Sequence, residues 1–135
     1  MLNAGVIGMG VGEKHALAYQ NHANINLKSI YDFDQQKTNE LKTKFPGVSI
    51  ADKDQSILND KDIDVVSIAS YDNYHSNQIV NAISNSKHVM AEKPLCLNHN
   101  EMLEILEAQK QNPKVKLSSN LVLRANSMFL KFKND

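Results

Sequence analysis

Glycines cluster near the start of the chain, directly after the short apolar run Ala4-Gly5-Val6-Ile7. The cluster reads Gly8-Met9-Gly10-Val11-Gly12, and a segment that favours a helix follows it. A backbone without Cβ atoms can turn sharply from a strand into a helix, and it lets a phosphate approach the amide N–H groups at the helix N-terminus. We therefore expect these five residues to bind a pyrophosphate, such as that of a dinucleotide cofactor.

The spacing of these glycines differs from the common dinucleotide motif. In G-x-G-x-x-G the third glycine would stand at position 13, but that residue is Glu13 and the glycine comes one residue earlier, at Gly12. We interpret the loop as shortened by one residue. A glycine-rich turn without any ligand is the alternative.

An acidic residue ends the second apolar run. Asp32 follows residues 25–31, about 20 residues beyond the glycines, where a carboxylate can bind both hydroxyls of the adenosine ribose and repel a 2′-phosphate. A turn acid or a helix cap is the alternative for Asp32, but Asp34 is better placed to cap the next helix. The only arginine is Arg124, far along the chain, so the pattern favours NAD over NADP.

Short β-branched runs alternate with segments of helical periodicity, and these elements must position the glycines and the acid. The runs predict strands near residues 4–7, 25–31, 48–50, 65–69, 88–91 and 115–117. The run 65–69 is apolar on both faces, as in a central strand covered by helices. This alternation predicts an α/β fold: a doubly wound parallel sheet (Rossmann fold) of about six strands, with helices on both faces.

Local signals also mark where helices begin and end. Asp34 can cap a helix that Pro46-Gly47 stops, and Asn98 with Glu101 three residues later forms a potential capping pair. Apolar stripes predict the buried faces of two later helices. The stripes consist of Ile79, Val80 and Ile83 in one helix and of Met102, Leu103, Ile105 and Leu106 in the other.

Composition and charge exclude several classes of protein. The 135 residues contain 15 lysines and arginines against 15 aspartates and glutamates, and this zero net charge argues against nucleic-acid binding. No apolar run approaches the roughly 18 residues of a membrane span, and the start lacks a secretory signal. Cys96 has no adjacent histidine and no second cysteine, so we expect a structural role for it, no metal site and a cytoplasmic location.

Two further motifs carry a resemblance to a known family. Asp64-Val65-Val66-Ser67-Ile68-Ala69-Ser70 is followed by His75, and Ser86-Lys87-His88-Val89 is followed by Glu92-Lys93-Pro94. With these motifs the chain resembles, over essentially its whole length, the nucleotide-binding half of the Gfo/Idh/MocA family (glucose–fructose oxidoreductase, inositol dehydrogenase and rhizopine catabolism). The Lys-His-Val and Glu-Lys-Pro pair is the most specific part, because many other dehydrogenases share the glycine loop.

The resemblance implies an NAD(P)-dependent oxidoreductase that acts on a sugar, a cyclitol or a related small hydroxyl or carbonyl compound. In the family the lysine of Glu-Lys-Pro lies beside the nicotinamide and contacts the substrate, so Lys93 is the expected catalytic residue. An ammonium there can stabilise the negative charge that develops on an alcohol oxygen, or relay its proton. Glu92 is expected to hold Lys93 or to contact the nicotinamide, and His75 to contribute to the cofactor site. Packing or capping is the alternative for His75.

The chain departs from the family pattern in two respects. Ser70-Tyr71 stands where the family has Thr-Pro, and we expect this pair to line the cofactor site with an altered backbone. In the family a substrate domain follows the cofactor domain. We therefore expect a dinucleotide-binding domain at 1–120, and in 121–135 the start of a junction to a substrate domain that this chain lacks. Alone, the chain should bind NAD with little turnover, and the apolar segment 121–132 should favour a homo-oligomer.

Two other functions remain open at this point. The first is a stand-alone nucleotide-binding or sensing module without catalysis, against which the presence of Lys93 argues mildly. The second is a related Rossmann domain that binds coenzyme A or a nucleotide sugar. Asp32 disfavours coenzyme A, because the carboxylate would face a phosphorylated ribose.

Overall fold

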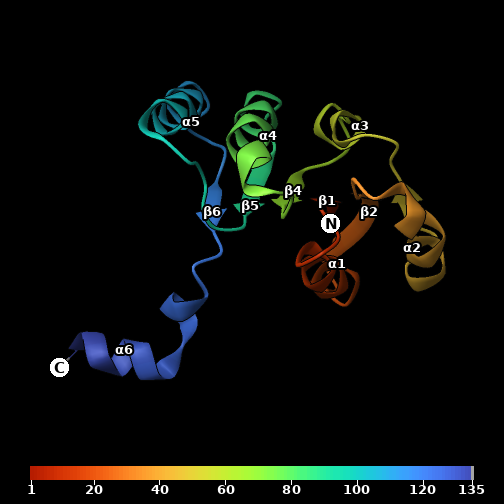
Figure 1. Cartoon of the computed structure of the whole chain (residues 1–135), viewed down its shortest axis with the longest axis horizontal. Helices are drawn as coiled ribbons and strands as arrows, with labels where there is room; N and C mark the ends of the chain where they lie inside the picture. Colours follow the sequence, from red (N-terminus) through yellow and green to blue (C-terminus); the bar gives the residue numbers. More distant parts are fainter. Residues whose placement is uncertain (135) are drawn as a thin grey trace.

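β-branched and other apolar residues form six parallel strands, and these make a single sheet in the computed structural model, which describes residues 1–134 (Figure 1). The strand order is β3-β2-β1-β4-β5-β6, so the direction of winding reverses between β1 and β4. This order and the parallel pairing confirm the predicted doubly wound fold. The strands are β1 (Leu2–Ile7), β2 (Ile25–Tyr31), β3 (Ser49–Ile50), β4 (Val65–Ile68), β5 (His88–Ala91) and β6 (Leu117–Ser119).

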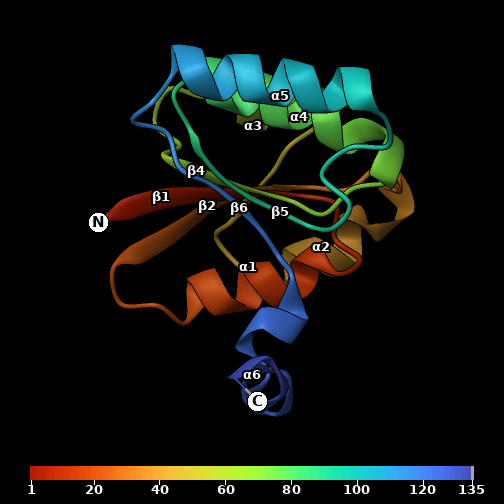
Figure 2. The same cartoon turned by 90° about the vertical axis from the view of Figure 1, so that its left-hand side faces the viewer.

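Helices cover both faces of the sheet. Figures 1 and 2 show α1 and α2 on one face, and α3, α4 and α5 on the other. The short helix α3 was not predicted, because a single turn is too short to show helical periodicity. The helices are α1 (Gly12–Gln20), η1 (Gln35–Lys37), α2 (Thr38–Lys44), α3 (Asp54–Leu58), α4 (Asp72–Ser84) and α5 (His99–Gln111).

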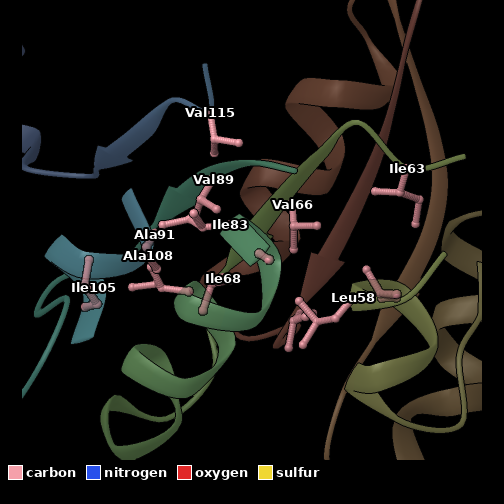
Figure 3. Packing of buried hydrophobic residues seen from close by; sticks show 14 of the residues in the cluster. Leu58, Ile63, Val66, Ile68, Ile83, Val89, Ala91, Ile105, Ala108 and Val115 are labelled. Atoms are coloured by element: carbon pink, nitrogen blue, oxygen red, sulfur yellow. The ribbon is translucent and has the colours of Figure 1, made fainter. Parts of the chain in front are cut away.

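The larger hydrophobic core lies between the sheet and the layer of α3, α4 and α5. Side chains from β4, α4, β5 and α5 converge there, among them Ile68, Ile83, Val89 and Ile105 (Figure 3). A smaller core on the other face contains Val6, Ile30, Leu41 and Phe45. Burial on both faces explains why β1 from Ala4 to Ile7, and β4 apart from Ser67, consist of apolar residues and glycine. It also makes the sheet a rigid platform for the loops at its ends.

The helix α5 forms as expected, but its buried face was predicted wrongly. Met102, Leu103 and Leu106 are exposed, whereas Ile105 and Ala108 are buried. The reason is that α5 packs against α4 at the edge of the layer, so only a narrow stripe of its surface is covered. The predicted cap is confirmed: the Glu101 N–H donates to Asn98 Oδ1 at 3.0 Å, and Asn98 Nδ2 donates to Glu101 Oε1 at 2.8 Å.

The sixth strand begins two residues later than predicted, at Leu117 instead of Val115. After it the chain forms η2 (Val122–Ala125) and α6 (Ser127–Asn134), which extend away from the two helical layers (Figures 1 and 2). Met128, Phe129 and Leu130 of this segment are exposed. Within residues 1–134, no helix combines the length and the apolar character needed to cross a lipid bilayer.

Candidate cofactor site

Backbone hydrogen bonds continue one residue beyond the carboxyl ends of the strands. Four of these bonds link β2, β1, β4, β5 and β6 in spatial order, so the loops that follow them start side by side. The four donor–acceptor pairs, each at 2.8 Å, are Gly8 N to Tyr31 O, Ala69 N to Ile7 O, Glu92 N to Ile68 O and Asn120 N to Ala91 O. The glycine loop and the Glu92-Lys93 motif therefore share one edge of the sheet, where doubly wound folds bind ligands.

Gly8 occupies a position that a side chain cannot share. Its φ of +87° lies in the left-handed region, and a Cβ atom would stand 2.6 Å from the Ser70 nitrogen and would overlap the carbonyl of Ala69. The turn out of β1 therefore passes directly against the turn out of β4. Glycine at this position is a requirement of the backbone, independent of any ligand.

Gly12 takes the role that the third glycine has in the longer motif. A Cβ on Gly12 would lie 3.0 Å from Val6 Cγ1 and 3.1 Å from Ala69 Cβ, so the absent side chain allows α1 to begin close to the sheet. Glu13 instead accepts a hydrogen bond from Lys44 Nζ at 2.6 Å and does not disturb this packing. A Cβ on Gly10 would meet no atom within 4 Å, so the loop has open space where a phosphate would approach.

Asp32 holds the glycine loop against the end of β2. Its Oδ2 accepts a hydrogen bond from the Met9 N–H at 2.6 Å, and its Oδ1 accepts one from the Asp34 N–H at 2.8 Å. Asp34 accepts a hydrogen bond from the Gln36 N–H at 3.0 Å and thereby caps the short helix η1. The helix it was expected to cap, α2, begins directly after η1 and has no side-chain cap of its own. Each carboxylate oxygen has two lone pairs, so Asp32 can hold the loop and still accept hydrogen bonds from ribose hydroxyls.

A pocket of about 120 Å³ lies between the glycine loop and Asp32. Two of its residues, Phe33 and Lys37, were not predicted from the sequence. The Phe33 ring lies 5.8 Å from the ring of Tyr71, between centroids, and Lys37 Nζ lies 3.7 Å from Asp32 Oδ1. Their position soon after the strand-end acid Asp32 is the sequence feature that could have predicted them as site residues. The pocket is lined by Gly8, Gly10, Asp32, Phe33, Lys37, Ala69, Ser70 and Tyr71.

Ser70 belongs to a hydrogen-bonded network that ties the loop after β4 to two helices. Its hydroxyl donates to Gln78 Oε1 at 2.6 Å, and Gln78 Nε2 donates to Asp54 Oδ2 at 2.8 Å. Gln78 is 1% exposed, so the network fixes the Ser70 backbone from inside the protein. Tyr71, in contrast, is exposed beside the pocket, where its ring is accessible to a ligand.

His75 lies inside the protein, 1% exposed, near the start of α4. Its Nδ1 lies 2.6 Å from the carbonyl oxygen of Pro94, and its Nε2 lies 3.1 Å from that of Ser70. The ring therefore joins the loop after β4 to the turn that carries Lys93, in which the Lys93–Pro94 peptide bond is cis. In this position His75 orients backbone, which agrees with the packing alternative more closely than with a direct cofactor contact.

Glu92 is held by two side chains from other elements. His15 Nε2 of α1 lies 3.1 Å from Glu92 Oε1, and Asn120 Nδ2, after β6, donates to the same oxygen at 2.6 Å. The other ring nitrogen of His15, Nδ1, is buried without a hydrogen-bond partner. Neither His15 nor Asn120 was predicted as a site residue, since each meets Glu92 only through the order of the strands.

These contacts make stability depend on pH through Glu92. Burial opposes the charged form. The hydrogen bond from Asn120, the charge and hydrogen bond of His15 and the backbone N–H of Lys93 together outweigh it, and they lower the pKa of Glu92 below its ordinary value. As the pH falls, Glu92 is protonated in the unfolded chain before it is protonated in the folded protein. The stabilisation is therefore complete above the pKa of the unfolded chain, and it is lost as the pH falls to the lower pKa of the folded protein.

We expect Glu92→Gln to lower the free energy of unfolding by about 1–3 kcal/mol at pH 7, because hydrogen bonds to a charged group are lost. The difference from the wild type should shrink below about pH 4.5, the ordinary carboxyl range. Urea unfolding measured between pH 3 and pH 7 tests this. The matched control is Glu104→Gln on the exposed face of α5, and a difference between wild type and Glu92→Gln that is independent of pH would contradict the expectation.

Lys93, which follows Glu92 in the sequence, is exposed. It lines a cleft of about 470 Å³ together with Glu92, Asn120 and the stretch from Leu121 to Arg124. An exposed ammonium just beyond the carboxyl end of a strand is suited to stabilise charge on a substrate oxygen. The described residues contain no group of three or more side chains suited to hold a metal ion.

Residues 2–120 match the Gfo/Idh/MocA family, which is described as an oxidoreductase family with an NAD-binding Rossmann fold. The chain belongs to this family. Gfo/Idh/MocA membership confirms the resemblance seen in the Glu-Lys-Pro motif, and it identifies the glycine loop and Asp32 as parts of an NAD-binding domain.

Among the Gfo/Idh/MocA relatives, the myo-inositol 2-dehydrogenase of Thermotoga maritima is 33% identical over 112 residues, which are 82% of this chain and 33% of that protein. The inositol 2-dehydrogenase of Salmonella typhimurium is 26% identical over 139 residues, which cover 98% of this chain and 40% of that protein. The chain thus spans between a third and two fifths of these relatives.

A solved structure has the same fold over nearly the whole chain. The scyllo-inositol dehydrogenase of Lactobacillus casei, with bound NAD(H) and scyllo-inositol, superimposes with a TM-score of 0.87. The two are 23% identical, and the match covers 99% of this chain and 40% of that one.

Proposed function

We propose that this chain forms the cofactor half of an oxidoreductase that transfers a hydride between NAD and a hydroxyl or carbonyl group of a sugar or cyclitol. One observation carries the proposal. The hydrogen bonds beyond the strand ends place the glycine loop, the Ser70-Tyr71 turn and the Glu92-Lys93 motif along one edge of the sheet. A dinucleotide that extends along this edge has its pyrophosphate at the glycine loop and its reactive ring at the Glu92-Lys93 motif.

Each group along the edge has a role in this proposal. The loop Gly8 to Gly12 binds the pyrophosphate, and Asp32 accepts hydrogen bonds from the adenosine ribose. Ser70 and Tyr71 line the path towards the nicotinamide ribose, and Glu92 lies beside the nicotinamide. His75 supports this arrangement by holding the turn after β5 against the turn after β4.

Lys93 is the proposed catalytic residue. NAD, when bound, supplies the acceptor for the hydride that leaves the alcohol carbon. Oxidation of the alcohol removes a hydride from carbon and a proton from oxygen, and the Lys93 ammonium can stabilise the alkoxide character of the oxygen or relay its proton. Glu92, the preceding residue, is fixed by His15 and Asn120.

The substrate class rests on the relatives, since several of them are named as inositol dehydrogenases. A cyclitol or sugar has several adjacent hydroxyl groups. An exposed cation such as Lys93 can bind these hydroxyls, whereas an apolar pocket could not. The chain spans a minor part of the length of those relatives. We propose that this chain alone binds cofactor with little turnover.

Calorimetric titration with NAD, NADH, NADP and NADPH tests the cofactor assignment. We expect NAD and NADH to bind more tightly than their phosphorylated forms, and Asp32→Ala to weaken NAD binding by tenfold or more, because hydrogen bonds to a charged acceptor are lost. Glu40→Ala, which removes an exposed acid of α2 outside the pocket, is the control. If none of the four nucleotides binds to the folded chain, the proposed function fails.

We also propose that the protein is cytoplasmic and that it self-associates through the segment after β6. Leu121, Val122, Leu123, Phe129 and Leu130 are exposed there, and apolar surface gathered on one segment favours association in water. Light scattering should show a species larger than the monomer at about 0.1 mM, and Phe129→Asp should shift it towards the monomer. A monomer over the whole concentration range would contradict this.

A further inference from the structure

The ribose end of the cofactor site contains a cation as well as the acid. Lys37 is the last residue of η1, and its Nζ lies 3.7 Å from Asp32 Oδ1. Both side chains line the same pocket as Gly8 and Gly10. From the sequence, the absence of a nearby arginine indicated that nothing at this end would attract a phosphate, and the fold changes that conclusion.

The two charges are close together, yet neither neutralises the other through a hydrogen bond. Asp32 already accepts from the N–H groups of Met9 and Asp34, and these bonds fix its orientation. A separation of 3.7 Å exceeds hydrogen-bond length, so the N–H groups of Lys37 remain available to another acceptor. The Lys37 side chain is 43% exposed against 11% for Asp32, so the cation is the more mobile partner.

The two side chains act in opposite directions on a phosphate at the ribose 2′ position. Asp32 accepts hydrogen bonds from two free hydroxyls and repels a 2′-phosphate. Lys37 attracts the phosphate and has little to contribute to an uncharged hydroxyl. Its flexible side chain can move towards an added anion, whereas Asp32 is fixed by the backbone.

We propose that Lys37 is a specificity-determining residue that offsets the repulsion by Asp32, so that the site binds NADP(H) measurably while it still prefers NAD(H). The inference rests on the nucleotide site of the proposed function and adds to it the tolerance of a 2′-phosphate. It assigns the discrimination between the two cofactors to a pair of residues, one of which acts only on the phosphorylated form.

The test is a titration of NAD and NADP into the wild type and Lys37→Ala. We expect Lys37→Ala to raise the Kd for NADP by about three- to tenfold, the range for a partly exposed charge contact, and to change the Kd for NAD by less than twofold. Lys42→Ala removes an exposed positive charge from α2 and should leave both constants unchanged. Asp32→Asn, with Lys37 kept, should tighten NADP binding relative to NAD.

The salt dependence separates a direct contact from a general field. Raising the salt concentration should reduce the difference between the wild type and Lys37→Ala for NADP, with little effect on NAD. Circular dichroism and thermal unfolding should be nearly unchanged in this variant, because the side chain is on the surface.

Three outcomes would overturn the inference: no measurable NADP binding by the wild type at millimolar concentration, equal loss of NAD and NADP affinity in Lys37→Ala, or unchanged NADP affinity in that variant. All three are distinct from failure of the proposed function, which would appear as absent NAD binding by the wild type.

Discussion

Replacing Gly8 with alanine is expected to abolish measurable NAD binding and to lower the free energy of unfolding by about 2–5 kcal/mol. Both effects have one cause. The new methyl group would overlap the backbone of Ala69 and Ser70, and the residue would be held at a φ of +87° that L-residues with a side chain seldom adopt. Relief requires the turns after β1 and β4 to separate, and these turns form the two sides of the proposed cofactor crevice.

Gly10→Ala is the matched control for Gly8→Ala. A methyl group there would contact no protein atom within 4 Å, so we expect the free energy of unfolding to stay within about 0.5 kcal/mol of the wild type. The same methyl group would enter the space proposed for the pyrophosphate, and NAD binding should weaken. Urea unfolding and calorimetry of both variants test the pair, and a Gly8→Ala variant that folds and binds normally would refute this account of the loop.

Replacing Lys93 with methionine is expected to reduce turnover by about 10²–10⁴-fold, the usual range for a positioned group that transfers a proton or stabilises charge. Methionine keeps the length of the side chain and removes only the ammonium. Lys93 is exposed, so the substitution should not alter folding, and NAD affinity should change by less than about threefold. A large loss of turnover with preserved cofactor binding is specific to a catalytic cation.

The measurement requires a protein that holds substrate. Residues 1–120 can be joined to the remaining part of the Thermotoga maritima myo-inositol 2-dehydrogenase, and Lys93→Met is then compared with the same fusion carrying lysine. Lys93→Arg separates the two chemical roles, because arginine keeps the charge but cannot release a proton at neutral pH. Unchanged turnover in Lys93→Met would remove the catalytic role and favour a nucleotide-binding module.

The contacts of Lys37 and Glu92 differ in how far apart their partners lie in the sequence. Lys37 meets Asp32 within five residues of sequence, so its role was accessible in principle once the acid was recognised. Glu92 meets His15 across 77 residues and Asn120 across 28, and these contacts exist only because β1, β5 and β6 follow in the observed spatial order. Neither contact was predicted, but only the first lies within the reach of local motifs.

The sequence by itself determined the approximate positions of the strands, their parallel arrangement, the glycine loop, the strand-end acid and the Asn98 cap. Each of these depends on neighbours within a few residues: β-branched runs favour strands, glycines allow the turn, and a cap bonds to its own helix. The Glu-Lys-Pro motif added the family, and the match over residues 2–120 confirmed it.

Only the tertiary structure decided how these pieces act together. It showed that Gly12 takes the packing role of the missing third glycine, because that role depends on Val6 and Ala69 rather than on spacing within the loop. It placed His75 in the interior between two carbonyl groups, and it left the leucines of α5 exposed. The physical reason is common to all three: burial and side-chain partners are set by which elements pack against each other, and strand order determines that packing.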